Sequence, residues 1–381
     1  MMFIFKITCD SIWVEGVGTA RSGSVSKLIS IISSIFILSA DERVSLTFAG
    51  DLMAHDVNYS TKPFSAIYDG VASELLEDDL SFINLEFPVD DSRKYSSYPS
   101  FNVQSPYVKA AITGGFDVFS LGNNHTNDFG YVSLMNTISS MDKFVNSDSI
   151  VYSGVVKDDE SSFRIETIQV KNITIGFLAV TQFNNNFWDK KGAAKVYTSD
   201  YNGKDSGQKL LDLIEKKSND YDCLILSYHG GVEYSPGPST NRKVFFNKLL
   251  DAGVDILWGQ HPHVLQPWYK VSTEDGDKLV MYSMGNFISG QLAIVDPVNH
   301  DVNFAATGIS SLFKMDIELR KGKLVILDPH PKMIANIRNK DRYFVTVLKN
   351  IALTDPMSNK WAYFYKKMFP IGEYRIREEK Y

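Results

Sequence analysis

Residues 116–128 read FDVFSLGNNHTND, an apolar run that ends abruptly in amide, imidazole and carboxylate side chains. The run 116–121 predicts a buried strand, and the polar residues after it predict a loop at the carboxyl end of that strand. In an open α/β fold, the loops that leave the carboxyl ends of the strands converge on one crevice. This stretch therefore predicts one strand and one loop of an α/β protein, with the loop facing a binding site.

Three other segments are organised in the same way. Residues 51–55 read DLMAH, residues 228–233 read YHGGVE and residues 259–263 read GQHPH, and each follows an apolar run. Five of the seven histidines of the chain fall within these four motifs. Asp, Asn and His side chains on converging loops are typical ligands of a divalent metal ion. We therefore predict a metal centre whose candidate ligands are Asp51, Glu86, Asn124, His229, His261 and His263.

The two acidic candidates, Asp51 and Glu86, each follow a predicted strand. A carboxylate at the end of a buried strand needs a cationic partner or a metal ion to offset its desolvation. Either residue alone could instead cap a helix or shape a turn, which is the commoner role of a single Asp after Gly. Two such carboxylates ahead of two imidazole-rich loops favour metal binding.

The loop at residues 122–130 supplies the candidate catalytic groups. Asn124 can offer an amide oxygen to a metal ion. His125 can act as a general acid or donate a hydrogen bond to a developing negative charge, with Asp128 orienting its ring. The structural alternative is a cluster of Asx turns that caps the following helix. The candidate catalytic residues are therefore His125 and Asp128.

The imidazole candidates are His229 and the pair His261 and His263. Pro262 between the pair favours extended backbone before it, and residues one apart in an extended segment point the same way. We therefore expect both rings on one side of an extended segment. The mixture of oxygen and imidazole ligands suits Mn, Fe or Zn, and six candidates suffice for one or two ions.

The other three histidines receive no role. His55 would share the face of Asp51 only if the chain turns helical between them. His300 and His330 have no partner motif in the sequence.

Predicted strands and helices alternate from residue 41 onward, which favours a layered α/β sheet, and a strand-rich part after residue 264 adds a second sheet. Residues 67–79 predict a helix, and residues 163–170 and 173–180 predict a hairpin turned at 171–172. We predict one domain over residues 41–335 and a C-terminal extension over residues 336–381, with a helix at 359–368.

The N-terminal segment, residues 1–40, predicts an export signal or an anchor. Residues 28–38 read LISIISSIFIL, follow Lys27 and precede small residues that resemble a cleavage site. This run is too short to span a bilayer as a helix. Because the mixed-charge prefix 1–26 does not fit a signal, either the true start lies near Val25 or the segment is an anchor or a buried helix. The sequence favours export to the periplasm, the cell surface or a membrane-anchored location.

Charge and cysteine content exclude two classes of protein. The formal net charge is −6 and the pI is about 5.7, without a basic stripe, so no nucleic-acid partner is expected. Two cysteines cannot form a disulfide framework. Cys223 lies in an apolar run, which predicts a buried free thiol on a strand.

Six ordered stretches resemble the CapA family of bacterial capsule-synthesis, or poly-γ-glutamate biosynthesis, proteins. That family looks like a divergent branch of the calcineurin-like metallophosphoesterases. The resemblance spans residues 44–290, with looser similarity to about 335, and implies an α/β fold: a four-layer β-sandwich of two sheets flanked by helices. The matching stretches are 48–53 (FAGDLM), 84–88 (NLEFP), 121–130 (LGNNHTNDFG), 229–234 (HGGVEY), 255–264 (DILWGQHPHV) and 282–288 (YSMGNFI).

Carried over to this chain, the resemblance supports the same ligand set. Asp51 takes the place of the first metal Asp of the phosphoesterases, and Glu86 resembles their metal-bridging Asp. The pair 124–125 resembles their Asn-His pair, and the remaining ligands correspond to His229, His261 and His263.

Two positions depart from the family patterns. Gln260 stands where the family usually has His, at a position that we do not count as a ligand. Met53 stands where true phosphoesterases complete an Asp-x-His motif, which argues against a full two-metal phosphatase centre.

The resemblance implies an exported protein that acts in the synthesis, handling or cleavage of a capsule or poly-γ-glutamate-type polymer. The expected partners are the anionic surface polymer or its synthesis machinery, with membrane association through the N-terminus left open. A general metal-dependent phosphoesterase or amidase and a non-catalytic polymer-binding accessory are the alternatives, so enzyme status is open. The aromatic stretch 183–188 (FNNNFW) is either a substrate-side loop or a surface turn with packed aromatic rings.

Overall fold

The computed structural model describes residues 4–8, 11–15, 43–156, 163–205, 207–339, 342–347 and 359–380. The chain divides into two compact units, Met1–Glu42 and Arg43–Tyr381, and each is described by itself. In the first unit, β1 (Ile4–Thr8) and β2 (Ser11–Glu15) form an antiparallel hairpin. The predicted export signal at residues 28–38 lies outside the described residues.

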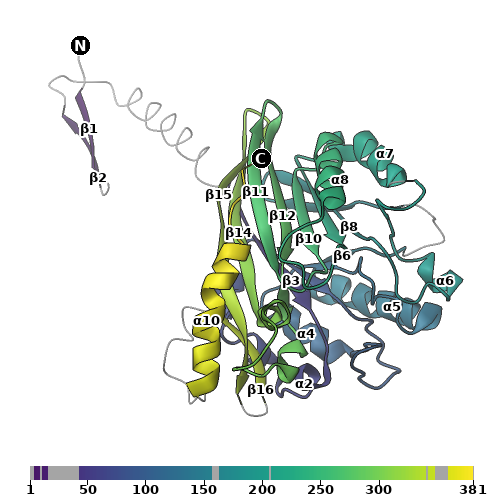
Figure 1. The fold of residues 1–381 in the computed structure, drawn as a ribbon. Coiled ribbons are helices and arrows are strands. Elements are labelled where there is room, and N and C mark those ends of the chain that lie inside the picture. The colour runs from purple at the N-terminus through teal and green to yellow at the C-terminus, as the bar shows by residue number, and fades with distance from the viewer. Residues whose placement is uncertain are drawn as a thin grey trace. The chain divides into compact units, whose positions relative to one another are not determined.

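The second unit is built on a large mixed sheet (Figure 1). In the part of the chain that the structure describes, its order is β6-β5-β4-β3-β14-β15-β12-β10-β9-β8-β7, with β11 on β12, β13 on β3 and β16 on β15. The strands are β3 (Val44–Leu52), β4 (Leu80–Leu85), β5 (Val118–Ser120), β6 (Val151–Ser153), β7 (Glu166–Val170), β8 (Ile173–Thr181), β9 (Cys223–His229), β10 (Ile256–Gln260), β11 (Leu265–Thr273), β12 (Gly276–Met284), β13 (Asn286–Ile288), β14 (Ile309–Arg320), β15 (Lys323–Asn339) and β16 (Arg342–Val347).

The sheet consists of two halves, and the strands at the centre of each half run parallel to one another. In the first half, β3, β4, β5 and β6 are parallel neighbours. In the second half, β8, β9, β10 and β12 are parallel neighbours. One residue pair, Gly276 with Leu324, joins β12 to β15 and so connects the halves. The two sheets predicted for the sandwich are therefore two halves of one hydrogen-bonded sheet.

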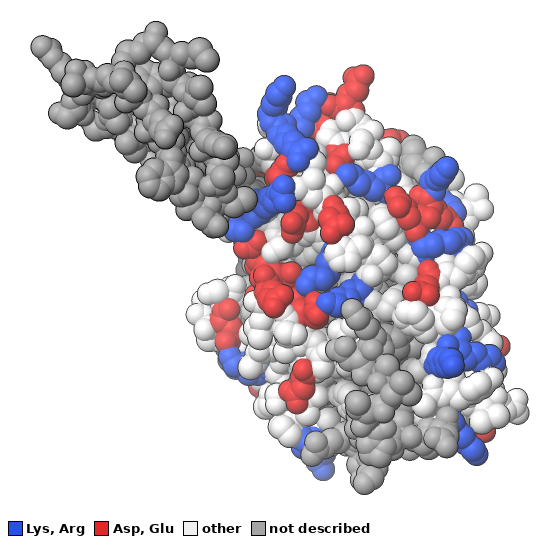
Figure 2. All heavy atoms as spheres, turned by 90° about the vertical axis from the view of Figure 1, so that its left-hand side faces the viewer, with Lys and Arg blue, Asp and Glu red and all other residues white. Residues whose placement is uncertain are grey.

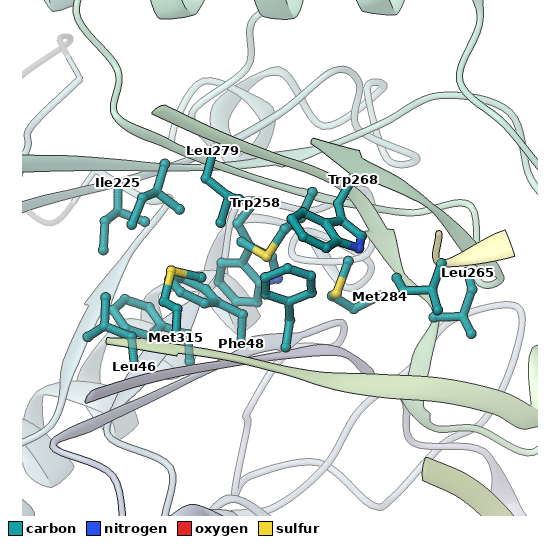
Figure 3. Close-up of a cluster of buried hydrophobic side chains, with 14 of the residues drawn as sticks. Leu46, Phe48, Ile225, Trp258, Leu265, Trp268, Leu279, Met284 and Met315 are labelled. Carbon is teal, nitrogen blue, oxygen red and sulfur yellow. The ribbon is translucent and has the colours of Figure 1, made fainter. Parts of the chain in front are cut away.

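The two halves pack face to face around a shared core (Figure 3). Phe48 of β3 stacks on Phe82 of β4 at 4.5 Å between ring centroids. Phe48 also lies 5.6 Å from Trp258 of β10 in the opposite half, and the Trp258 indole N–H donates to the carbonyl oxygen of Ala49. Since these side chains are fully buried, their removal from water is the main force that holds the halves together.

Helices cover the outer faces of both halves and complete four layers (Figure 1). α4 (Ser105–Thr113) and α5 (Gly130–Asp148) pack on the first half, and α7 (Gln208–Lys217) and α8 (Thr240–Asp251) pack on the second. The predicted four-layer α/β architecture is confirmed. The shorter helices are α2 (Asp56–Tyr59), α3 (Ala72–Leu76), α6 (Lys190–Ala193), α9 (Val302–Ala305), η1 (Phe64–Ile67), η2 (Ser218–Asp220), η3 (Gln291–Ile294) and η4 (Ala306–Gly308).

The C-terminal helix α10 (Asn359–Arg375) begins at the predicted residue and continues beyond 368. Its Phe364 and Met368 are buried in the shared core. Among the described residues from 336 onward, the end of β15, β16 and a bridge from Glu378 to Trp268 also join the fold.

The predicted helix at residues 67–79 is wrong as a single element. The chain forms η1 and α3 instead, separated around Gly70. Gly70 makes a β-bridge to Thr346 of β16, and a Cβ at this position would lie 2.5 Å from the Val345 carbonyl oxygen. This close approach to another strand interrupts the helix, which local periodicity does not reveal.

Two smaller predictions are confirmed. β7 and β8 form the expected antiparallel hairpin, with Lys171 in the left-handed region at its turn (φ 49°). Cys223 is a buried free thiol at the start of β9.

The surface carries charges of both signs. On the face shown in Figure 2, Lys and Arg side chains are interspersed with Asp and Glu. Within the described residues, the longest apolar stretch of any helix falls short of what a membrane span needs.

Candidate metal centre

The predicted site residues lie at the carboxyl ends of parallel strands from both halves of the sheet. Asp51 lies near the end of β3, and Glu86 follows β4. The 122–128 loop follows β5, His229 ends β9, and the 261–263 segment follows β10. Because these strand ends meet at one edge of the sandwich, residues far apart in sequence become neighbours.

An irregularity in β3 places Asp51. The pairing of β3 with β4 shifts register between Phe48 and Asp51, and the Asp51 N–H donates to the Gly285 carbonyl oxygen (3.0 Å). A Cβ on Gly50 would lie 1.7 Å from that same oxygen, so only glycine fits there. The Asp51 carboxylate accepts a hydrogen bond from Asn84 Nδ2 (2.9 Å), and its Oδ2 lies 3.2 Å from His263 Nδ1.

Glu86 is the least compensated charge in the site. Its side chain is fully buried, and neither carboxylate oxygen accepts a hydrogen bond from any described residue. Oε1 lies 3.5 Å from His229 Nε2 and 3.8 Å from His263 Nε2. Burial, and next the neighbouring Asp51 carboxylate, raise the pKa of Glu86 well above its usual value. A cation beside Glu86 would compensate the ionised carboxylate that burial otherwise disfavours, so the donor set fits a metal ion.

Two triads of potential ligands share Glu86. Asp51, Glu86 and His263 form one, and Glu86, His229 and His261 form the other, each with its ligand atoms within 4.8 Å of one another. Asn124 Oδ1 lies 2.7 Å from His229 Nε2 and joins the second triad. The structure thus brings together all six predicted ligands, with Glu86 in the position of a bridging ligand. Oxygen and imidazole donors in these numbers suit Mn, Fe or Zn.

The backbone of the 261–263 segment differs from the prediction. His261 (φ 93°) and His263 (φ 59°) both adopt left-handed conformations, so the segment is bent rather than extended. The bend is held by the Tyr234 N–H, which donates to the Pro262 carbonyl oxygen (2.8 Å), and by the His261 N–H near Asp51 Oδ2 (3.4 Å). Of the two triads that share Glu86, His261 belongs to one and His263 to the other, while a third group of potential ligands holds both rings together with Glu233.

The pKa values of the three candidate histidine ligands shift in different directions. Burial, and next the neighbouring imidazoles, lower the pKa of His229 and of His261 well below the usual value. Burial also acts to lower the pKa of His263, but the carboxylates of Glu86 and Asp51 outweigh it and raise that pKa to about 9. Neutral imidazole is the form that binds metal ions, and a bound cation would displace the proton of His263.

His125 and Asp128 form a dyad beside the ligands. His125 Nδ1 lies 2.8 Å from Asp128 Oδ2, and Asp128 Oδ2 also accepts from the Phe101 N–H (2.8 Å). Burial raises the pKa of Asp128, and the contact with His125 opposes this shift. The N-cap of α5 is Phe129, and Asp128 makes no capping bond to that helix. Asp128 is therefore placed to orient His125, and it does not cap the helix.

Three residues that contact this site were not predicted as functional. Asn84 donates to Asp51 and accepts from Asn123 Nδ2 (3.1 Å), and Asn286 Oδ1 lies 2.9 Å from His263 Nδ1. Glu233 is exposed, yet its carboxylate lies within 4.8 Å of ligand atoms of His261 and His263. All three stand in stretches that carry the family resemblance, which is the signal that could have singled them out.

His55 also lies beside the site. Its Nδ1 accepts from the Gly290 N–H (3.0 Å), and its ring lies edge-on to Phe101, which packs in the same way on His125. Burial, and next the neighbouring His263, lower the pKa of His55 to about 4. It is therefore a neutral ring at the N-terminus of α2. By contrast, His300 contacts the Asp296 carbonyl oxygen and the Phe364 ring, and His330, in β15, contacts the Asp328 carbonyl oxygen.

A fully buried arginine lies behind the histidine loops. Arg242 of α8 donates to the Gln260 carbonyl oxygen and to Gln266 Oε1 (both 3.4 Å), and its guanidinium lies over the Phe246 ring. A Cβ on Gly231 would lie 2.8 Å from this guanidinium. Arg242 thus ties together the loops that carry His229 and the 261–263 segment. The side chain of Gln260 is buried and makes no hydrogen bond to the described residues.

Known proteins resemble this chain in sequence and in structure. A model of the family described as "Bacterial capsule synthesis protein PGA_cap" matches residues 45–291. The chain is 25% identical over 328 residues to the capsule biosynthesis protein CapA of Bacillus anthracis, which covers 81% of this chain and 74% of that protein. It is 27% identical over 259 residues to the PGA biosynthesis protein CapA of Bacillus subtilis (strain 168), covering 66% and 65%. Among solved structures, a hypothetical protein from Thermus thermophilus aligns with a TM-score of 0.43 and 15% identity, over 76% of this chain and 99% of that chain.

Proposed function

The chain belongs to the PGA_cap family of bacterial capsule synthesis proteins, and we propose that it makes, handles or cleaves an anionic capsule polymer of the poly-γ-glutamate type at a metal centre. The two CapA relatives are named for capsule and PGA biosynthesis, which supports this polymer class. Export, with membrane association through the N-terminus, is part of the proposal and rests on the uncharged run at residues 28–38.

The observation that carries the proposal is the environment of Glu86. This carboxylate is buried without a hydrogen bond from the described residues, and it belongs to both triads of potential ligands. Without a cation, the ionised form of this carboxylate would cost several kcal/mol, which is why burial raises its pKa. Divalent cations remove that cost, and the shared position of Glu86 supports one or two of them.

The ligands proposed for the metal are the members of the two triads, together with Asn124. A divalent ion held there supplies Lewis acidity toward a carbonyl or phosphoryl oxygen. Beside it, Asp128 holds His125 through Nδ1, so that Nε2 of the ring is the atom that can hand a proton to a leaving group. This dyad favours a hydrolase or transferase over a purely polymer-binding accessory, because an accessory needs no oriented proton donor.

A gene-deletion experiment tests the proposal. We expect that deleting the gene in its own bacterium lowers the amount of surface polymer, and that the wild-type gene restores it. Glu86→Gln keeps the shape of the side chain but removes its charge, so it should not restore the polymer. Restoration by Glu86→Gln would instead support an accessory role, and unchanged polymer after deletion would contradict a role in the capsule.

A further inference from the structure

The 182–189 loop, which follows β8, lies against the ligand-bearing loops of both halves. The Gln182 N–H donates to the His229 carbonyl oxygen (2.8 Å), and Gln182 Oε1 accepts from the Gly231 N–H (3.1 Å). On the other side, the Asn185 N–H donates to the Asn124 carbonyl oxygen (3.0 Å). The loop thus bridges the second half of the sheet and the first.

Further hydrogen bonds fix the shape of this loop. Asn186 and Asn127 exchange two bonds, from each side-chain amide to the carbonyl oxygen of the other residue (3.0 and 3.2 Å). Asp189 accepts from the Tyr131 N–H at the start of α5 and from the Gly192 N–H in α6. Because so many polar groups are paired, the side chains that the loop exposes are held in place beside the metal centre.

The first exposed side chains of the loop contact site residues, and an exposed aromatic pair follows them in the sequence. The Phe183 ring packs edge-on against the His261 ring (5.1 Å) and is 37% exposed. Asn185 is exposed, and its Nδ2 lies 3.4 Å from His125 Nδ1. Phe187 and Trp188 then pack on each other (4.3 Å) while remaining 51% and 78% exposed.

Two lysines follow this aromatic pair. Lys190 and Lys191 are both exposed, and neither forms an ion pair within the described part of the chain. Lys191 Nζ lies 3.7 Å from the centroid of the Tyr131 ring, which leaves its charge unneutralised. Many other lysines of the protein, such as Lys171 and Lys278, are paired with carboxylates. Two free cations beside two exposed rings form a surface suited to an anion with an apolar backbone.

We infer that the 182–189 loop and the two lysines after it form the binding track for the polymer, and that they guide an anionic polyamide chain toward the metal centre. A γ-glutamyl unit carries a carboxylate, two methylene groups and an amide. Its carboxylates would pair with Lys190 and Lys191, its methylenes would pack on Phe187 and Trp188, and its amides would reach Asn185 beside His125. The inference rests on the proposed function, because it takes the polymer as the substrate.

Binding of poly-γ-glutamate to the full-length, metal-loaded protein tests this inference. We would measure the fluorescence anisotropy of labelled poly-γ-glutamate with wild type, with Lys190→Gln/Lys191→Gln and with Phe187→Ser/Trp188→Ser. Each double variant should bind the polymer about tenfold more weakly than wild type. For the lysine variant this difference should appear only at low salt, because salt screens exposed charge pairs. The matched control is Lys209→Gln/Lys216→Gln on α7, two exposed lysines that also form no ion pair with the described residues, and it should bind like wild type.

The outcomes separate this inference from the proposed function. Metal content and the binding of inorganic phosphate should be unchanged in the two loop variants, since neither variant alters a metal ligand. Wild-type affinity for the polymer in both loop variants would overturn the binding track and leave the proposed function standing. If wild type binds phosphate but no polymer, both the track and the polymer assignment are wrong.

Discussion

Oδ1 of Asn124 lies 2.7 Å from Nε2 of His229, although 105 residues separate them in the sequence. Asn124 follows β5 in the first half of the sheet and His229 ends β9 in the second, so this contact joins the two halves at the site. An ion held by ligands from both halves would cross-link them. Metal binding and the stability of the fold are therefore expected to be coupled.

Removing two imidazoles should remove the metal. His261→Ala/His263→Ala takes one ligand from each triad, so we expect metal content by elemental analysis to fall to background in a protein with an unchanged circular dichroism spectrum. His330→Ala is the control, because the His330 side chain lies in β15, contacts Asp328 and belongs to no group of potential ligands. Unchanged metal in the double variant would show that the ligand assignment is wrong.

Replacing His125 should separate metal binding from turnover. His125→Ala leaves both triads intact, so the metal should remain bound. Any hydrolysis of a phosphoester or a γ-glutamyl polymer should fall by about 10²–10⁴-fold, because the proton donor is lost. Asp128→Asn keeps the His125 ring but weakens the contact that orients it, so activity should fall less than in His125→Ala. Full activity in His125→Ala would remove this residue from the catalytic role.

The stability of the metal-free protein should fall as the pH rises. The pKa of His263 is raised from 6.5 to about 9, so its contribution is fully present below pH 6.5 and is lost as the pH rises through about 9. The shift corresponds to about 3 kcal/mol. Burial and Asp51 also raise the pKa of Glu86 above 4.5, which adds a decline in the same direction.

Urea unfolding in the presence of a chelator, from about pH 6 to about pH 10, measures this decline. With metal bound, the ion takes the place of the proton on His263 and the profile should flatten. A chelated protein whose stability does not change over this range would contradict the assigned charge state of His263.

Replacing Trp258, in the core between the two halves, should lower the stability of the fold. Trp258→Phe removes buried volume and the hydrogen bond to the Ala49 carbonyl oxygen, so we expect a loss of about 2 kcal/mol in the free energy of unfolding. Trp188→Phe changes a side chain that is 78% exposed and should stay within about 0.5 kcal/mol of wild type. Equal effects of the two changes in urea unfolding would mean that Trp258 does not hold the halves together.

The sequence could predict which residues the fold brings together, because strand ends are local features. The apolar runs before Asp51, Glu86 and Asn124 indicate buried strands, and polar residues directly after such runs indicate loops at their carboxyl ends. The same local signal fails at Gly70, where a bridge to Thr346 divides the predicted helix. It fails again at His261 and His263, because contacts from Tyr234 and Asp51 bend a segment that Pro262 alone would favour as extended.

The sequence by itself determined the class of fold, the order of the ligand motifs and the family, since periodicity and motif spacing are properties of short segments. The tertiary structure alone decided which of the predicted ligands lie together, that Glu86 is common to two triads, and that Asn84, Asn286, Glu233 and the 182–189 loop surround them. The physical reason is that each triad, like the 182–189 loop, draws its contacts from both halves of the sheet. Which strand faces which depends on the packing of the whole core around Phe48 and Trp258, and no local pattern encodes that packing.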